Sequence, residues 1–354
     1  MNMNQLFAPT AMGFYQLSNR LVMAPMTRSR AAYDGSPTDM MTKYYAQRAS
    51  IGLIISEGTQ PSDEGQGYLS TPGIYTDAHI AAWKKISDAV HAKGSHLFIQ
   101  LMHAGRMSHP DNTPHHHQAL APSAIAPNAP MFTPTGMQEI PTPRAMSLDD
   151  IQQTIADFRH AARFAIEAGA DGVEIHGANA YLIQQFLAPS ANTRTDQYGG
   201  SIENRALFAI EVASAIADEI GADKTGIRLS PQTKLWGIDE GADSVELYHY
   251  LVKELNKLKL GYLHILHQGN EQLVTDLRKI WQSTFILNRP SRPREQIGSD
   301  IASGLADLEA YGQMVLANPD FVERLKLNAP LNVADRNTFF GGNAQGYIDY
   351  PFLT

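Results

Sequence analysis

Short apolar runs alternate with longer amphipathic stretches along most of this 354-residue chain. Each run has the length of a strand, and the stretches between them repeat their apolar positions at helical spacing. Such alternation is typical of a parallel sheet wrapped by helices, and eight strands suit a closed (β/α)₈ barrel, a TIM barrel. The expected strands are residues 21–24, 52–56, 96–100, 172–175, 226–229, 262–266, 285–287 and, weakest in pattern, 308–311.

The segments between and around these strands complete the expected fold. Outer helices are predicted over residues 80–92, 149–167, 202–220 and 244–257, with glycines near three of their ends. The stretch 105–144 is rich in proline and histidine and has no clear period, so we expect a long loop after the third strand that roofs an active site. Residues 4–20 form a cap segment outside the eight units. We find no repeat or linker, and we expect one domain over residues 1–354.

Composition narrows the function classes. Hydrophobic residues make up 43% and charged residues 18% of the chain, the balance of a soluble globular enzyme. The absence of cysteine excludes disulfides, thiolate zinc sites and iron–sulfur clusters. A net charge of −8 disfavours nucleic acid as a partner. No apolar stretch is long enough for a membrane span, and residues 1–5 lack the basic start of a signal peptide, so we expect a cytoplasmic protein.

Polar residues follow several expected strands, where the loops of a barrel build its active site. A single polar residue there is more often a hydrogen-bonded structural group, so order and spacing decide. The fourth strand gives the most informative pattern. His176 and Asn179, three residues apart, can approach the same volume while Gly177 supplies a sharp turn, and Tyr181 enters from another side.

Two blocks near the fourth strand, HGANAYLIQQFL at 176–187 and NTRTDQYGGSIENR at 192–205, carry a specific resemblance. They resemble the Old Yellow Enzyme family of FMN-dependent ene reductases, in particular its bacterial N-ethylmaleimide reductase and pentaerythritol tetranitrate reductase branch. The resemblance covers nearly the whole chain. Supporting pieces are residues 24–27, 68, 71–74, 100–106, 228–231, 317–320 and 346–351.

The resemblance implies a flavin chemistry and roles for three side chains. FMN would lie across the barrel mouth, take electrons from NADPH or NADH, and pass hydride to the β-carbon of an enone, maleimide or nitroalkene. His176 and Asn179 would donate hydrogen bonds to the substrate oxygen. Tyr181 would protonate the α-carbon, because a phenol with a reference pKa of about 10 carries its proton at neutral pH.

The resemblance also assigns residues to cofactor and pocket. Arg228 would stand beside the flavin pyrimidine edge, where a permanent cation stabilises the anionic reduced ring. Tyr68 and Tyr350 would be aromatic walls of the substrate pocket; the alternative is that they are core tyrosines with satisfied hydroxyls. The full set of expected cofactor-binding residues is Pro25, Met26, Thr27, Gly58, Gln100, Arg228, Asn288, Arg289, Gly312 and Gln313.

The chain departs from the family where the family holds the FMN phosphate. After the seventh strand, Asn288-Arg289-Pro290 stands in place of a glycine pair whose N–H groups face the phosphate. At the eighth strand, Gly312-Gln313 replaces Gly-Arg, so a neutral amide stands where a cation is usual. We expect weakened FMN binding unless Arg289, Arg292 or Arg294 compensates. The loop after the sixth strand is also expected to be remodelled.

Two other functions compete with the ene reductase. A repurposed, non-catalytic barrel that has lost stable flavin is supported by the altered phosphate region. A metal-dependent barrel hydrolase is suggested by His115-His116-His117 with His103 and His109 nearby. Consecutive histidines in an irregular loop lack the supporting carboxylates of a metal site, so we expect a solvated loop and no metal. His264 and His267 are expected to be satisfied barrel histidines.

Overall fold

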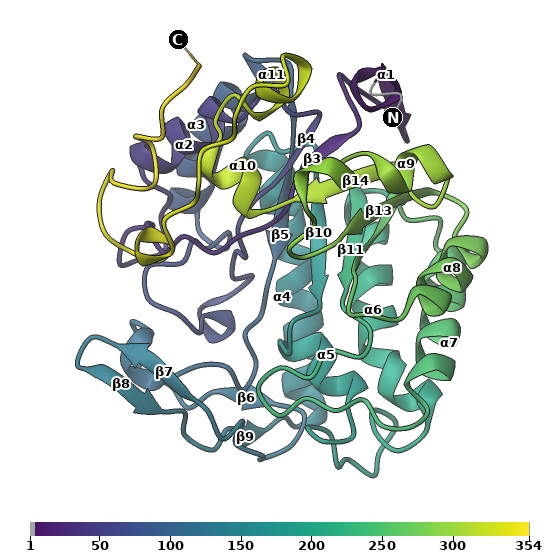
Figure 1. The fold of residues 1–354 in the computed structure, drawn as a ribbon. Helices are drawn as coiled ribbons and strands as arrows, with labels where there is room; N and C mark the ends of the chain where they lie inside the picture. The colour runs from purple at the N-terminus through teal and green to yellow at the C-terminus, as the bar shows by residue number, and fades with distance from the viewer. Residues whose placement is uncertain (1–3, 354) are drawn as a thin grey trace.

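A computed structural model describes residues 4–353, so the first three residues of the segment examined for a signal peptide lie outside it. Eight parallel strands close a barrel in which the last strand pairs with the first (Figure 1). The predicted (β/α)₈ fold is therefore confirmed, with strand ends shifted by up to two residues. The barrel strands are β3 (Leu21–Met23), β4 (Leu53–Ile55), β5 (His96–Leu101), β10 (Gly172–Gly177), β11 (Thr225–Leu229), β12 (Tyr262–Leu266), β13 (Thr284–Asn288) and β14 (Leu308–Tyr311).

The barrel interior is closed at the amino-terminal ends of the strands. The cap segment begins with α1 (Asn4–Phe7) and forms a hairpin of β1 (Thr10–Met12) and β2 (Tyr15–Leu17). Met12 and Leu17 of this hairpin are buried in the same core cluster as strand residues such as Phe98. The Tyr15 hydroxyl donates to the carbonyl of Asp171, just before β10, at 2.5 Å. Ligands must therefore approach from the carboxyl ends of the strands.

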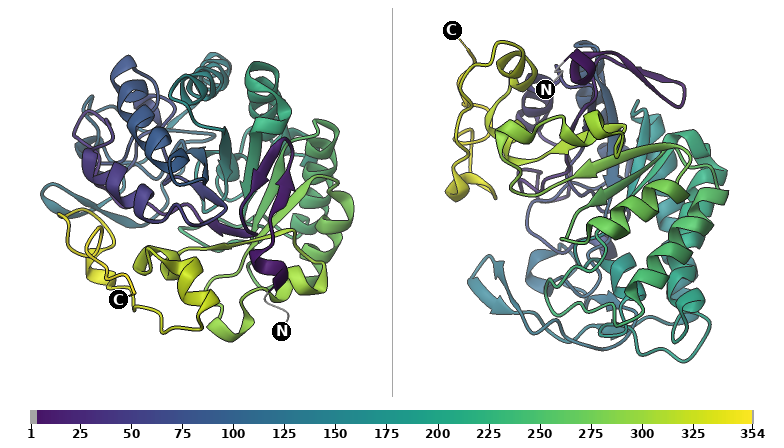
Figure 2. Two further views of the ribbon diagram at one scale, coloured as in Figure 1. Left: turned by 90° about the horizontal axis from the view of Figure 1, so that it is seen from above. Right: turned by 45° about the vertical axis from the view of Figure 1, so that its right-hand side comes forward.

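Amphipathic helices cover the outside of the strands, as the view from above in Figure 2 shows. Threonine, serine or asparagine side chains accept backbone N–H groups at the start of most of them, which fixes where they begin. Two of the four predicted helices have the predicted bounds. The longer helices are α2 (Asp39–Gln47), α3 (Asp77–His91), α4 (Leu148–Glu167), α6 (Ile202–Ile220), α7 (Ser244–Lys257) and α8 (Glu271–Ile280).

The units after β10, β13 and β14 carry short helices. Helix α5 (Leu182–Leu187) starts a few residues after β10 and is entirely buried. The last two strands are followed by α9 (Ser299–Ser303), α10 (Gln313–Ala317) and α11 (Phe321–Lys326). Among the described residues, no helix combines the length and apolar character that a bilayer crossing requires.

The stretch 105–144 contains more regular structure than the sequence predicts. It holds β6 (Leu120–Ala121), which pairs with β9 (Arg144–Ala145), and a hairpin of β7 (Pro130–Thr133) and β8 (Gly136–Glu139) that projects from the barrel (Figure 1). The hairpin strands are short and half exposed, so they leave little periodic signal. The predicted position of this stretch after the third strand is confirmed.

The C-terminal tail runs along the outside of the barrel near α2 (Figure 2). Arg28 and Arg48 donate to tail carbonyls, including that of Tyr347. The Tyr347 ring stacks on Tyr44 of α2 with centroids 4.2 Å apart. These contacts fix which side chains of the tail can reach the barrel mouth.

Candidate active site

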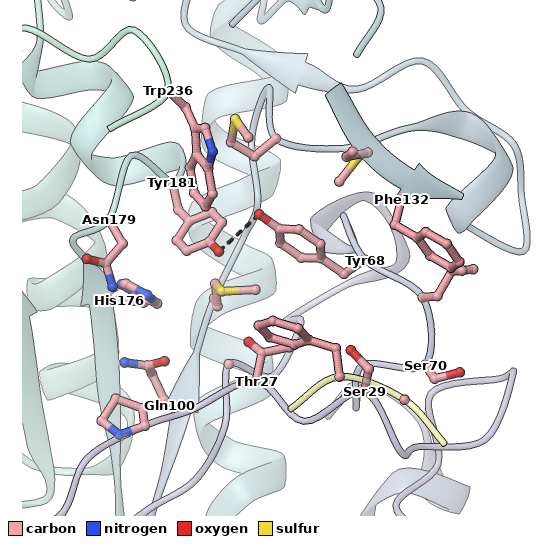
Figure 3. A pocket seen from close by; sticks show the side chains of 18 of the residues that line it. Thr27, Ser29, Tyr68, Ser70, Gln100, Phe132, His176, Asn179, Tyr181 and Trp236 are labelled. Atoms are coloured by element: carbon pink, nitrogen blue, oxygen red, sulfur yellow. Dashed lines mark hydrogen bonds between the residues drawn. The ribbon is translucent and has the colours of Figure 1, made fainter. Parts of the chain in front are cut away.

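A cavity of about 830 Å³ opens at the carboxyl ends of the strands, between the barrel mouth and the β7–β8 hairpin (Figure 3). The predicted roof is therefore confirmed, because Met131, Phe132 and Met137 of the hairpin line the cavity. Loops after β3, β4, β5, β10 and β11 and the C-terminal tail supply its other walls. The predicted site residues among those that line it are Pro25, Thr27, Gly58, Tyr68, Gln100, His176, Asn179 and Tyr181.

His176 presents a neutral imidazole to this cavity. Burial, with smaller contributions from the nearby Arg228 and His264, lowers the pKa of His176 well below its usual value. The backbone N–H of Ala178 donates to Nδ1 at 3.2 Å, so the single proton of the neutral ring resides on Nε2. Nε2 has no hydrogen-bond partner within residues 4–353. The ring can therefore donate one hydrogen bond to a bound molecule.

The turn after β10 holds Asn179 in a strained conformation. Asn179 and Ala180 have φ values of 54° and 67°, in the left-handed region that costs roughly 1–2 kcal/mol per non-glycine residue. Their N–H groups donate to Ser230 Oγ at 2.9 Å and to Gln184 Oε1 at 2.7 Å. These two acceptors offset the strain and leave the Asn179 amide side chain facing the cavity (Figure 3).

The role predicted for Gly177 is wrong. This glycine is the last residue of β10, and its φ is not positive, so it does not make the turn. A Cβ there would lie 2.9 Å from Leu229 Cδ2 and 3.1 Å from the Arg228 carbonyl oxygen. Gly177 is small because β11 approaches it closely, and the left-handed residues follow two positions later.

Tyr181 stands above His176, with ring centroids 5.0 Å apart. Its hydroxyl donates to the Tyr68 hydroxyl at 3.1 Å across the cavity (Figure 3). Burial raises the pKa of Tyr181 to about 12. The phenol is therefore protonated throughout the neutral range, as a proton donor must be before it acts.

A buried charged network lies below the cavity. Gln100 lines the cavity and donates to Glu174 at 2.8 Å, and His264 Nδ1 lies 2.8 Å from the same carboxylate. Arg228 contacts His264 through Nη1 and donates from Nη2 to Asn288 at 3.0 Å. Burial lowers the pKa of Arg228 to about 10, so it stays cationic at neutral pH. Its Nε is buried without a partner in the described part of the chain, and His264 is satisfied as predicted.

Tyr350, predicted as a wall of the substrate pocket, does not line the cavity, so this placement is corrected. Met26 does not line it either, and its role in cofactor binding stays a prediction. The Tyr350 hydroxyl accepts the backbone N–H of Asp335 within the tail, because the stacking of Tyr347 turns the following residues away from the mouth. The tail residues that do line the cavity are Phe340 and Gly341. Met26 packs against the core.

The sequence reasoning missed the apolar part of the lining. Trp236 lies over Tyr181, with ring centroids 6.0 Å apart, and its carbonyl accepts from Arg106 at 3.1 Å (Figure 3). Nothing in the sequence pattern of the segment 232–236 placed Trp236 at the cavity. Phe132, Met137 and Phe340 are 64%, 64% and 70% exposed, so they resemble surface residues in sequence and structure alike.

The residues predicted to hold a phosphate lie outside the cavity lining: Asn288, Arg289, Gly312 and Gln313. The three arginines predicted to compensate already have partners in the described chain, and their role toward the phosphate stays a prediction. Arg289 and Arg292 pair with carboxylates, and Arg294 donates to Asn328 at 3.1 Å.

Two histidines of the histidine-rich loop pair with carboxylates of the loop after β4. His115 pairs with Asp63 at 3.1 Å and His117 with Glu64 at 2.6 Å, and about half of each imidazole is exposed. Across the described ranges, no group of three or more potential ligands is arranged to hold a metal ion. These half-exposed imidazoles agree with the prediction of a solvated loop.

A (β/α)₈ barrel whose mouth carries neutral hydrogen-bond donors and a protonated tyrosine above a buried cation suits the class of barrel flavin oxidoreductases. The chain belongs to the NADH:flavin oxidoreductase / NADH oxidase family, whose model matches residues 5–332. It is 45% identical over 361 residues to 12-oxophytodienoate reductase 1 of Oryza sativa subsp. japonica, covering 98% of this chain and 93% of the relative.

Solved structures agree with this assignment. Morphinone reductase is 41% identical and superposes with a TM-score of 0.94 over 100% of this chain and 98% of its own. The Old Yellow Enzyme homologue of Zymomonas mobilis is 37% identical, with a TM-score of 0.95 over 99% of this chain and 100% of its own. The resemblance to the Old Yellow Enzyme family is confirmed, and the chain is an NAD(P)H-dependent flavin oxidoreductase that acts on carbon–carbon double bonds, with FMN as the family's cofactor.

The residues that would surround the ring of FMN differ in character from those that would surround its phosphate. The ring end fits: Gln100 and Thr27 line the cavity floor, and the Arg228 guanidinium below has a buried Nε without a partner in residues 4–353. Gly58 adds a close approach, since a Cβ there would lie 2.5 Å from the Met102 sulfur. At the phosphate end, the arginines that follow β13 are already paired.

Proposed function

We propose that this chain reduces the activated double bond of an uncharged enone, maleimide or nitroalkene, with NADPH or NADH as the electron donor. One observation supports this most strongly. His176, Asn179 and Tyr181 line one cavity, and the first two have side-chain donors without partners in the described chain. That combination suits an acceptor oxygen and an adjacent carbon that must gain a proton. We further propose that residues 1–354 act as one domain, and the cytoplasmic location stays a prediction.

The donors on β10 and its turn would bind the substrate oxygen. When bound, the flavin supplies hydride to the β-carbon of the alkene. His176 Nε2–H and the Asn179 amide N–H would hold the carbonyl or nitro oxygen and stabilise the negative charge that develops on it. Because His176 is neutral, its hydrogen bond persists without a charge change over the neutral range. The turn held by Ser230 and Gln184 keeps Asn179 in place before substrate arrives.

Tyr181 would complete the reaction by proton transfer. Its O–H bond breaks as a C–H bond forms at the α-carbon, which neutralises the charge that the hydride brought. Tyr68, which lies 3.1 Å from the Tyr181 hydroxyl, would donate a hydrogen bond to the resulting phenolate. The raised pKa of Tyr181 makes its phenolate a strong base, so it would regain its proton from solvent water.

The lining supports an uncharged substrate. None of the described residues that line the cavity is Asp, Glu, Lys or Arg, and four of them are methionines, Met102, Met107, Met131 and Met137. Thioethers adapt to irregular apolar shapes, whereas a charged substituent would lose hydration without gaining a partner. Bulky apolar alkenes should therefore be reduced faster than their carboxylate analogues.

The test compares an unsaturated ketone that carries an ester with the same ketone as its free acid, under anaerobic conditions with either nicotinamide. Reduction of the ester with the higher kcat/KM supports the proposal. Equal or faster reduction of the acid contradicts the part that concerns charge, and failure to reduce any electron-poor alkene contradicts the whole.

The second candidate is a family barrel that no longer holds flavin stably. The occupied arginines after β13 favour it. Purified protein that is yellow, or becomes yellow with added FMN, supports the reductase; colourless protein that cannot be reconstituted supports the second candidate.

A further inference from the structure

The loops after the seventh and eighth strands of a barrel, with the N-terminus of a short extra helix, often bind phosphate. In this chain the corresponding loops follow β13 and β14, and the short helix is α10. Phosphate sites of this kind depend on free backbone N–H groups and on cationic side chains. The hydrogen bonds and ion pairs of these loops therefore show what an incoming phosphate would meet.

Five charged side chains in this region form one ion-pair cluster: Glu271, Arg289, Arg292, Asp300 and Glu309. Arg289 donates to Asp300 at 2.9 Å and to Glu271 at 2.8 Å. Arg292 pairs with Asp300 and lies 3.0 Å from Glu309. Arg292, Asp300 and Glu309 are each less than a tenth exposed. Both guanidinium groups are thus paired with carboxylates of this chain, and only Nε of Arg292 lacks a partner among the described residues.

Glu309 also accepts hydrogen bonds from backbone N–H groups. Its carboxylate accepts the N–H groups of Gly298 at 2.7 Å, Asp300 at 2.8 Å and Ile301 at 3.3 Å. The Tyr311 hydroxyl donates to it too. The Glu309 carboxylate therefore occupies one guanidinium group, that of Arg292, and three backbone N–H groups that follow β13.

The balance of charge opposes a phosphate. Three carboxylates and two guanidinium groups leave the ion-pair cluster with a formal charge of −1. Gln313, the first residue of α10, brings no charge. Pro290, in the loop after β13, has no N–H to donate. A phosphate dianion at these loops would therefore meet two arginines already paired with carboxylates, and Arg294, which hydrogen-bonds Asn328, is the remaining cation of the loop after β13.

We propose that the ion-pair cluster has replaced the flavin phosphate at the last two loops, so that this chain binds flavin through its ring and discriminates little between FMN and riboflavin. The inference rests on the proposed flavin-dependent function. It extends the ligand class of the site to flavins without phosphate, with the buried groups under the cavity, Gln100 and Arg228, as the main determinants of affinity.

The test titrates the full-length, flavin-free protein with FMN and with riboflavin and follows the quenching of flavin fluorescence. One retained charge-assisted contact to phosphate would favour FMN by about tenfold or more. A Kd ratio below about tenfold supports the proposal, and a larger preference for FMN overturns it. If neither flavin binds, the proposed function fails as well, and this outcome is distinct from a strong preference for FMN.

A gain-of-contact variant sharpens the test. Gln313→Arg places a guanidinium at the start of α10, and we expect it to tighten FMN by about tenfold or more while riboflavin is unchanged. The control is Gln282→Arg, which adds the same charge just before β13, at the opposite end of the barrel. FMN affinity that does not respond to Gln313→Arg, or responds equally to Gln282→Arg, would overturn the assignment of the phosphate to these loops.

Discussion

Two sides of the same barrel mouth use polar residues in opposite ways. At the end of β10, His176, Asn179 and Tyr181 are neutral and face an open cavity. After β13 and within β14, Arg292 and Glu309 are charged and pair with each other. A side chain can bind a ligand only with hydrogen-bonding capacity that the protein itself has left unused. The type of a residue at a strand end therefore says less about function than the partners it already has.

The largest expected effect tests the neutral residues at the end of β10. Tyr181→Phe should slow alkene reduction by about 10²- to 10⁴-fold, because it removes the proton donor. Reduction of the flavin by the nicotinamide should keep its rate, since that step needs no proton from Tyr181. Stopped-flow absorbance at the flavin band measures the two half-reactions separately.

The control for this variant is Tyr250→Phe, which removes a hydroxyl from α7 on the outside of the barrel. It should leave both half-reactions unchanged. Equal loss in both half-reactions of Tyr181→Phe would remove this residue from the role of proton donor.

The ion-pair cluster should contribute strongly to the free energy of unfolding. Glu309→Ala leaves Arg292 without one of its buried partners, and breaking such a pair typically costs about 3–5 kcal/mol of unfolding free energy. Urea denaturation followed by circular dichroism measures the change. Asp88→Asn is the control, because its pair with Lys84 is exposed and contributes only about 0.3–0.5 kcal/mol. A Glu309→Ala loss as small as that of the control would contradict the role of the ion-pair cluster in folding.

A fall in pH should lower the stability contribution of His103 at the cavity wall before that of the ion-pair cluster. His103 supports the cavity wall by accepting the Gly105 N–H, and burial lowers its pKa to about 4. The unfolded chain then binds more protons than the folded chain between about pH 6.5 and 4, so stability falls as pH falls through that window. The expected contribution is about 1.4 kcal/mol per pH unit. The carboxylate of Glu271 in the ion-pair cluster has a lowered pKa because of its bond to Arg289, and it titrates only at lower pH.

The measurement compares the pH dependence of unfolding free energy in the wild type and in His103→Asn, whose Oδ1 can take the Gly105 N–H. Glu57 acts in the opposite sense, because burial raises its pKa to about 7, and it is common to both proteins. The slopes should differ by the contribution of His103. Parallel slopes would show that His103 does not titrate differently in the two states.

Sequence patterns predicted the parts of this molecule that depend on local repetition. The barrel follows from apolar runs at strand length, and helices α6 and α7 have the predicted bounds because their apolar faces repeat without interruption. The residues after β10 were predicted because they are close in the chain and identical in type to those of the family. Partners contributed from distant segments were not visible: nothing near Arg292 in the sequence indicates that Glu309 binds it. The placement of Tyr350 failed for the same reason, since Tyr347 and Tyr44 set the path of the tail.

The smallest expected effect tests how the turn after β10 holds Asn179. Ser230→Ala removes the oxygen that accepts the Asn179 N–H, so the strained turn loses one of its two side-chain acceptors. A buried N–H without a partner costs about 1–3 kcal/mol, and we expect a similar loss in kcat/KM for the alkene, about fivefold at the lower bound. Flavin reduction by the nicotinamide should change less. Ser190→Ala is a matched control, because Ser190 Oγ also accepts a backbone N–H, that of Asp239, but in an exposed position. Equal losses in the two variants would mean that the turn holds Asn179 without help from Ser230, and that its geometry comes from Gln184 alone.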